Sequence, residues 1–302
     1  MKFGNMIFQG GFTYPQIKEI WLESEKLGFN SVWAYDHLND CLEGWTLISA
    51  LAPMTDNIRF GLMVTCNSYR HPPLLAKMGA TLDIISDGRL EFGVGAGDRP
   101  EEYIGYGYPF PRASVRIKQL DEALNVIKKI WTEEGPTFEG KYYSIKEAKN
   151  EPKPIQKPYP LIWIGSLSGK RRIATLAANH ADVYNIRAWN PEDYVKKMDR
   201  FRECCKLVGR KFEDVEKTIH ILFVIGKNES HVNEKLAKYS HRTGISIDEC
   251  KKYCHYGTPD ELAVMFEQYA KLGVHGIILC FQPDKKMEDL HLFEEVIQGF
   301  GR

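Results

Sequence analysis

Short apolar runs alternate along most of the chain with longer segments in which apolar residues recur at helical spacing. The short runs are typical of buried strands, and the longer segments are typical of amphipathic helices. The pattern predicts strands at residues 2–8, 31–37, 58–66, 89–97, 161–165, 181–186, 218–226 and 275–281. It predicts helices at residues 15–29, 43–54, 73–86, 114–131, 170–180, 191–209, 229–257 and 259–273, and a last helix that closes the chain.

Strands that alternate with helices favour parallel pairing. Eight such units in 302 residues, with no shift in composition, favour one (β/α)8 TIM barrel domain over residues 1–302. The alternative is a doubly wound open sheet with an appended domain. The run GVGAG at residues 93–97 does not complete a dinucleotide-binding fingerprint, because Asp98 stands where the third glycine is needed.

One stretch, residues 134–160, interrupts the alternation with glycines, prolines and aromatic residues. We interpret it as an insertion after the fourth strand–helix unit, with a small hairpin in residues 136–145 and an extended segment in residues 151–160. Together with the variable loop at residues 230–256, it is expected to shape a substrate pocket.

Composition narrows the classes of partner. Lys plus Arg and Asp plus Glu both number 40, so the formal net charge is zero and neither a nucleic acid nor a membrane surface is an expected partner. The seven cysteines are scattered, and the first eleven residues are too short and too broken by glycine for a signal peptide, so we expect a cytoplasmic protein with reduced thiols. Cys250, Cys254 and His255 faintly resemble a metal motif, but this spacing is more typical of helix packing, and no metal site is predicted.

A barrel brings the carboxyl ends of its strands to one mouth, where active sites lie. Polar and small residues follow several predicted strands, and we expect them to converge there: Asp36 and His37, Thr65, Cys66 and Asn67, Gly97, Asp98 and Arg99, Ser166, Ser168 and Gly169, and Asn185. His37 is the leading candidate for proton transfer, because imidazole titrates near neutral pH; the alternative is a polar turn residue.

The residues around these strand ends also resemble those of a known protein family. The stretches LGFNSVWAYDHL, RHPPLLAKMGATLDIISDGRLEFGVGAG and PKPIQKPYPLIWIG resemble the bacterial-luciferase-like superfamily, and within it the coenzyme F420-dependent oxidoreductases. The resemblance extends to about residue 186. It implies a TIM barrel with insertions and a flavin-type ring at the third strand, with F420 as the expected cofactor and FMN as the alternative.

The resemblance also implies roles for individual residues. It places a non-prolyl cis peptide bond in the third strand at Met63–Val64, and it places His37 beside the ring carbon that exchanges hydride. Asp98 is a candidate second acid or base, although relatives carry other residues there. Residues expected to contact the cofactor are Asp36, Met63, Val64, Thr65, Cys66, Asn67, Ala96, Gly97, Glu101, Gly165, Ser166, Ser168 and Gly169. Glu101 and Glu102 are further candidates behind Asp98, although both are explained more simply as solvated charges at a helix start.

The first functional hypothesis is therefore an F420-dependent oxidoreductase that moves a hydride between the deazaflavin and a small organic substrate, with His37 as proton donor or acceptor. A second is an FMN-dependent luciferase-like monooxygenase that a separate flavin reductase supplies. A third is a flavin-binding barrel without catalysis. The resemblance also implies a homodimer.

Overall fold

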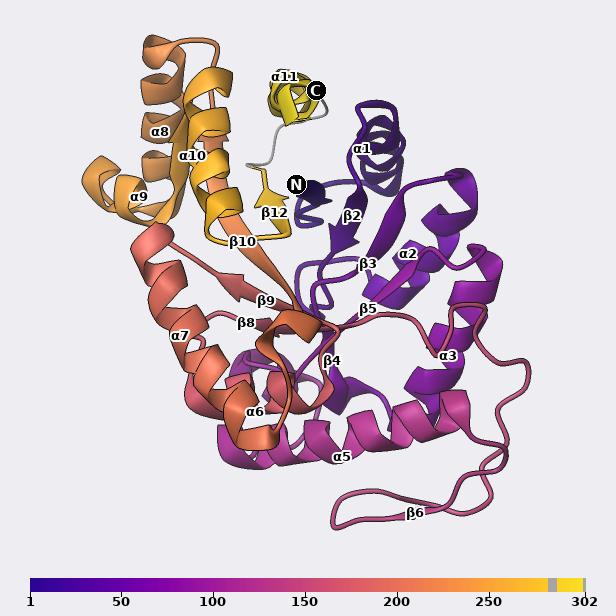
Figure 1. The fold of residues 1–302 in the computed structure, drawn as a ribbon. Helices are drawn as coiled ribbons and strands as arrows, with labels where there is room; N and C mark the ends of the chain where they lie inside the picture. The colour runs from indigo at the N-terminus through magenta and orange to yellow at the C-terminus, as the bar shows by residue number, and fades with distance from the viewer. Residues whose placement is uncertain (282–286, 301–302) are drawn as a thin grey trace.

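A closed barrel of parallel strands forms the centre of the protein (Figure 1). The computed structural model describes residues 1–281 and 287–300. In order around the barrel, the strands in these residues are β1 (Lys2–Met6), β2 (Ser31–Ala34), β3 (Arg59–Leu62), β5 (Leu90–Gly95), β8 (Ile162–Ser166), β9 (Val183–Arg187), β10 (Glu216–Ile225) and β12 (Gly276–Cys280). The last strand pairs with the first, with Lys2 opposite Gly276. The barrel prediction is thus confirmed, and the open-sheet alternative is wrong.

Helices surround the barrel in Figure 1. They are α1 (Tyr14–Lys26), α2 (Gly44–Leu51), α3 (Pro72–Ile85), α4 (Pro100–Gly105), α5 (Ala113–Thr132), α6 (Arg171–His180), α7 (Pro191–Val208), α8 (Glu229–Thr243), α9 (Ile247–Tyr253), α10 (Pro259–Lys271) and α11 (Glu288–Phe300). The sequence marks several of their ends. In α7, for example, the Asn190 side chain caps the first turn, Pro191 occupies the first position, and Gly209 adopts the left-handed conformation that ends the helix.

The strand predicted at residues 58–66 is divided in the structure. β3 ends at Leu62, and a two-residue strand β4 (Thr65–Cys66) follows. Between them the Met63–Val64 peptide bond is cis, as the resemblance implied. Both pieces pair with β5, so the interruption lies inside the sheet.

The helix predicted through residue 257 ends earlier. Gly244 ends α8, and His255–Gly257 forms a strand, β11, that extends the sheet along the last residues of β10. His255 is buried and its Nε2 lies 2.8 Å from the hydroxyl of Tyr269. This tertiary pairing outweighs the local helical pattern, which is a weak determinant by itself.

The excursion at residues 134–160 lies outside the barrel, at the lower right of Figure 1. It contains an antiparallel pair, β6 (Phe138–Glu139) and β7 (Ser144–Ile145). Its extended end is fixed at Gln156, whose backbone N–H and side-chain amide donate to the buried carboxylate of Asp83 at 3.0 and 2.6 Å. The same amide donates to the backbone oxygen of Leu90, the first residue of β5. This end of the excursion is therefore anchored at the strand beginnings, at the end of the barrel remote from the mouth.

The interior of the barrel is packed with large side chains. Trp33 and Trp163 meet with ring centroids 4.6 Å apart, and both are buried. Their indole groups donate to Ser31 and Glu91, so each buried N–H is satisfied. This layer closes the barrel below the mouth.

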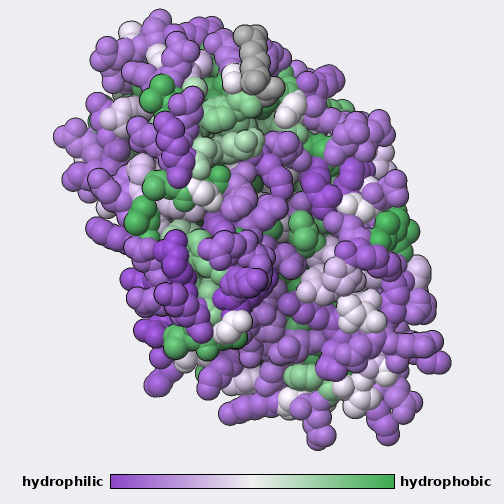
Figure 2. All heavy atoms as spheres, viewed as in Figure 1, coloured by the Kyte–Doolittle hydropathy of each residue, from purple (hydrophilic) through white to green (hydrophobic). Residues whose placement is uncertain are grey.

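The outer surface is mainly hydrophilic on the face shown in Figure 2, with hydrophobic residues gathered in its upper part. Figure 1 places α8, α10 and α11 on that side. Among the helices in the described part of the chain, none combines the length and apolar character that a membrane crossing requires.

Asp83→Ala should lower the free energy of unfolding by about 2–3 kcal/mol, because two donors of Gln156 would lose a charged acceptor. Urea denaturation measures the loss. The exposed Asp56→Ala is the matched control and should change stability by about 0.5 kcal/mol or less. A loss of that small size in Asp83→Ala would show that the excursion is not anchored through this carboxylate.

Candidate functional site

A cavity of about 820 Å³ lies at the carboxyl ends of the strands. Its volume falls within the range of small-molecule and cofactor sites. Many of the predicted site residues line it: Asp36, His37, Met63, Val64, Cys66, Ala96, Gly97, Asp98, Gly165, Ser166 and Ser168. Neither residues 134–160 nor residues 230–256 contribute to its wall, contrary to the expectation that they shape the pocket.

Four predicted residues lie away from the wall of this cavity. Thr65 and Asn67 are each only 1% exposed and belong to the packing around β4. Glu101 is exposed in the first turn of α4. Gly169 adopts a φ of 57° and its N–H donates to the hydroxyl of Ser166 at 2.9 Å. Its role is therefore to allow the loop to adopt this conformation.

His37 is held by the buried carboxylate of Glu102. Its Nδ1 lies 3.1 Å from Oε1 of Glu102, whose side chain is 1% exposed. Because a carboxylate only accepts, this contact puts the hydrogen of a neutral imidazole on Nδ1 and leaves Nε2 for a group in the cavity. The ring of Tyr35 stacks on His37 with centroids 5.5 Å apart. The imidazole is thus fixed in orientation on one side of the mouth.

Glu102 has further donors besides His37. The hydroxyl of Tyr69 donates to it at 2.9 Å, and the backbone N–H of Leu38 donates at 3.4 Å. Burial raises the pKa of Tyr69, so this phenol keeps its proton and acts as a donor. The reading of Glu102 as a solvated helix-start charge is wrong, because α4 turns this side chain inward beneath His37.

Asp36 organises the loop beside His37. Its carboxylate accepts from both terminal nitrogens of Arg70, at 2.7 and 2.9 Å, and from the backbone N–H of Cys66 at 2.8 Å. Arg70 also pairs with Glu43. A bidentate pair of this kind fixes geometry as well as charge.

The strand ends opposite Val64 have no room for side chains. A Cβ on Gly95 or Gly165 would lie 2.5 or 2.9 Å from a methyl carbon of Val64. One on Gly97 would lie 2.0 Å from the hydroxyl of Tyr103. Val64 therefore fills the space between neighbouring strands and, with these glycines, forms a smooth wall against which a planar ring can lie.

Cys66, beside this wall, is not a nucleophile. Burial raises the pKa of its thiol to about 11, and its sulfur lies 3.0 Å from the hydroxyl of Tyr103. The neutral thiol prevails near neutral pH, which agrees with a small buried hydrophobe.

An anion-binding feature lies at the start of α6. Its first helical hydrogen bond runs from the N–H of Ala174 to the oxygen of Lys170, so the preceding N–H groups have no partner within the helix. The Lys170 side chain does not cap them. The exposed side chains of Lys170, Arg171 and Arg172 line the same part of the cavity. Free N–H groups and cations together suit a phosphate.

Sequence reasoning missed several residues of the wall, above all Arg116, Arg187 and His220. Arg116 belongs to a long amphipathic helix, where one arginine carries no signal. In the structure it is 7% exposed and donates to the backbone oxygens of Ala96 and Gly97 at 3.2 and 3.1 Å. Arg187 and His220 stand at inward positions of strands, where their polarity within apolar runs was the available signal.

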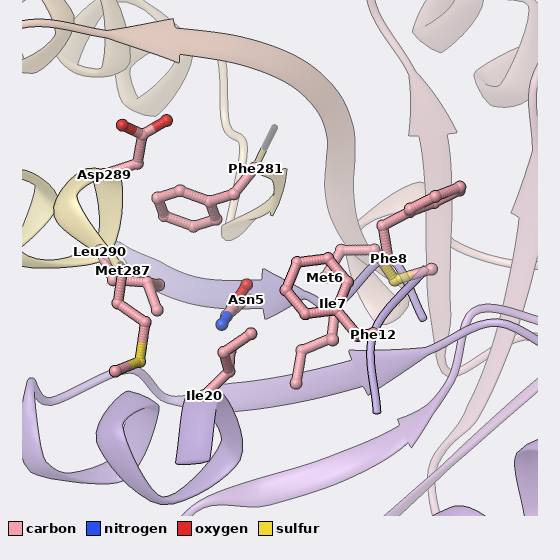
Figure 3. A pocket seen from close by; sticks show the side chains of 10 residues that line it. All are labelled: Asn5, Met6, Ile7, Phe8, Phe12, Ile20, Phe281, Met287, Asp289 and Leu290. Atoms are coloured by element: carbon pink, nitrogen blue, oxygen red, sulfur yellow. The ribbon is translucent and has the colours of Figure 1, made fainter. Parts of the chain in front are cut away.

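A second hollow, of about 30 Å³, lies beside β1 (Figure 3). It is mainly apolar, and its one amide, Asn5, donates to Ser24 at 2.8 Å. Phe8 lines both hollows. The small one is about the size of a single water site, so the large cavity is the candidate functional site.

Comparisons with known proteins agree with this geometry. A family model described as luciferase-like monooxygenase matches residues 1–273. An F420-dependent glucose-6-phosphate dehydrogenase from Microbacterium testaceum (strain StLB037) is 30% identical over 233 residues, which are 73% of this chain and 67% of the relative. The fold is similar to that of an F420-dependent secondary alcohol dehydrogenase in complex with an F420-acetone adduct, with a TM-score of 0.85, 22% identity and 98% of each chain covered. It is also similar to that of a monooxygenase from Streptomyces bottropensis, with a TM-score of 0.83, 22% identity and 100% of each chain covered.

His220 should make stability depend on pH. Burial, aided by the charge of Arg187, lowers its pKa to about 3, whereas an unfolded histidine titrates near pH 6.5. As the pH falls below that value, the unfolded chain binds a proton that native His220 does not, so the folded state loses stability. Between pH 7.5 and 5.5, His220→Gln should lose about 1 kcal/mol less than the unmodified protein, measured by urea denaturation. Equal losses would contradict a neutral buried His220.

Proposed function

Because this chain belongs to the luciferase-like monooxygenase family, we propose that it is an F420-dependent oxidoreductase that transfers a hydride between the cofactor and a small organic substrate. The named activity of the Microbacterium relative supports the cofactor. The observation that carries the catalytic part is the pair of His37 and buried Glu102 at the wall of the large cavity.

The residues of the cavity fit coenzyme F420. Val64 and the glycines at positions 95 and 165 provide the wall for the planar deazaflavin. Ser166, Ser168 and the start of α6 would hold the phosphate, and the exposed basic side chains at residues 170–172 suit the acidic tail. Bound F420 would supply or accept the hydride, a two-electron transfer that leaves one proton for the protein to handle.

His37 handles that proton in this proposal. With Nδ1–H directed at Glu102, the neutral ring presents a basic Nε2 that takes the proton of an alcohol as its carbon gives up hydride. In the reverse direction the protonated ring donates to a carbonyl oxygen. Glu102 stabilises the cationic ring in both directions and keeps it oriented. Asp98 is exposed at the rim, so we assign the proton transfer to His37 alone.

An FMN-dependent monooxygenase remains the second candidate, because the fold neighbours include a monooxygenase. The F420-dependent oxidoreductase and the FMN-dependent monooxygenase differ in their use of oxygen. Consumption of oxygen with reduced FMN, and none with F420, would favour the second candidate.

Replacing His37 should separate catalysis from cofactor binding. His37→Ala is expected to lower kcat about 100-fold or more, because proton transfer by a positioned side chain contributes that much, while the dissociation constant for F420 changes less than about threefold. The assay follows F420 absorbance with a panel of alcohols, carbonyls, imines and enones, and F420 fluorescence gives the affinity. Glu102→Gln should lower kcat about tenfold with F420 affinity kept, because it removes the charge that holds the imidazole.

His71→Ala is the matched control, because His71 is exposed on the neighbouring loop and does not line the cavity. It should keep the turnover of the unmodified protein. Full turnover in His37→Ala with F420 still bound would exclude His37 as the proton carrier.

A further inference from the structure

Arg187, at the end of β9, is a half-buried cation in the cavity wall that has no counter-ion. Within residues 1–281 and 287–300 its side chain forms no ion pair and donates no hydrogen bond, and its Nε is buried without a partner. The other inward arginine near the mouth, Arg70, has two carboxylate partners. A cation removed from water without a compensating anion is costly, so Arg187 points to an anionic ligand.

Within the described residues no carboxylate forms an ion pair with Arg187, and nearby Asp193 is already paired with Lys197. His220 is its register partner on β10, so both side chains lie on the inner face of the barrel. His220 is 5% exposed and its Nε2 has no hydrogen-bond partner. Asn185, two residues earlier on β9, is already engaged as a donor to Thr218. The floor thus presents one positive charge and neutral polar groups.

The guanidinium is positioned rather than free. It lies over the ring of Trp189, 5.2 Å from the centroid, and Trp189 is itself held edge-on against Tyr253. The backbone oxygen of Arg187 accepts from Lys197 at 2.8 Å. An arginine held in this way has little conformational freedom to lose when it binds an anion.

Arg187 faces His37 across the mouth. His37 follows β2, and Arg187 ends β9; three strands separate β2 from β9 on either path around the barrel. The exposed cations at the start of α6 lie on the rim, where a cofactor phosphate and a solvent-facing tail fit, whereas Arg187 lies inside beside buried His220. An anion at Arg187 would therefore belong to a molecule that reaches His37 from across the cavity.

We propose that the substrate is a small carboxylate-bearing alcohol or its carbonyl counterpart, with its carboxylate bound by Arg187 and its reacting oxygen at His37. This assignment rests on the proposed function. One unpaired cation matches a monoanion, and the guanidinium fork matches the two oxygens of a carboxylate. In the oxidation, the carbinol carbon loses a hydride to F420, its hydroxyl loses a proton to His37, and the hydroxy acid becomes an oxo acid.

Calorimetric titration with butyrate and butanamide, which share a shape and differ in charge, tests this assignment. Both probes are titrated into the protein with and without F420. The unmodified protein should bind butyrate at least about tenfold more tightly, because a charged bidentate pair forms only with the acid. Arg187→Met should abolish the preference. Arg187→Lys keeps the positive charge but not the forked guanidinium, so it should keep part of the preference for butyrate over butanamide. It also tests the proposal if Arg187→Met does not fold.

Arg112→Met removes an exposed cation outside the cavity wall and should keep the preference for butyrate. Equal binding of acid and amide by the unmodified protein, or an unchanged preference in Arg187→Met, would overturn the proposal. With F420 bound, and the phosphate site at the start of α6 therefore occupied, tighter binding of inorganic phosphate than of butyrate would overturn the carboxylate assignment, and loss of F420 affinity alone in Arg187→Met would place the cofactor at this residue. A protein that binds no F420 would refute the proposed function, while the titration without cofactor would still decide whether Arg187 binds a carboxylate.

Discussion

The candidate site depends on one buried carboxylate. Glu102 receives hydrogen bonds from His37, from the backbone of Leu38 and from Tyr69, and so joins the segments that follow β2, β4 and β5. A buried carboxylate needs such donors, because without them its charge would have no compensation for the lost water. The barrel brings these segments to one mouth, and Glu102 fixes how they meet. The orientation of His37 follows from that contact.

Charge is distributed unevenly around the mouth although the whole chain is neutral. Acidic groups support the loops: Glu102 binds His37, and Asp36 binds Arg70. Cations line the cavity, at its rim where α6 starts and in its interior at Arg187. The attraction for anions is therefore local to the cavity and does not arise from net charge.

Much of the fold could be predicted from the pattern of apolar residues, because each buried parallel strand is a short apolar run and each covering helix repeats its apolar face. The failures have tertiary causes. β11 forms because His255–Gly257 finds a partner in β10, which no local pattern reveals. The division of the third strand at Met63–Val64 followed only from the family resemblance. Residues at the strand ends, such as His37, could be placed at the mouth because the barrel rule applies to them. The roles of Glu102 and Arg187 could not be predicted, because each role depends on which partner the residue has or lacks after folding.

Binding of F420 and of FMN to the purified protein, followed by fluorescence, tests the central claim most directly. The wall formed by Val64 and its glycine neighbours admits either ring, whereas the basic start of α6 favours the longer acidic tail of F420. We expect F420 to bind at least about tenfold more tightly than FMN, and the preference to weaken as salt screens the cations. Tight binding of FMN with weak binding of F420 would contradict this account and favour a monooxygenase.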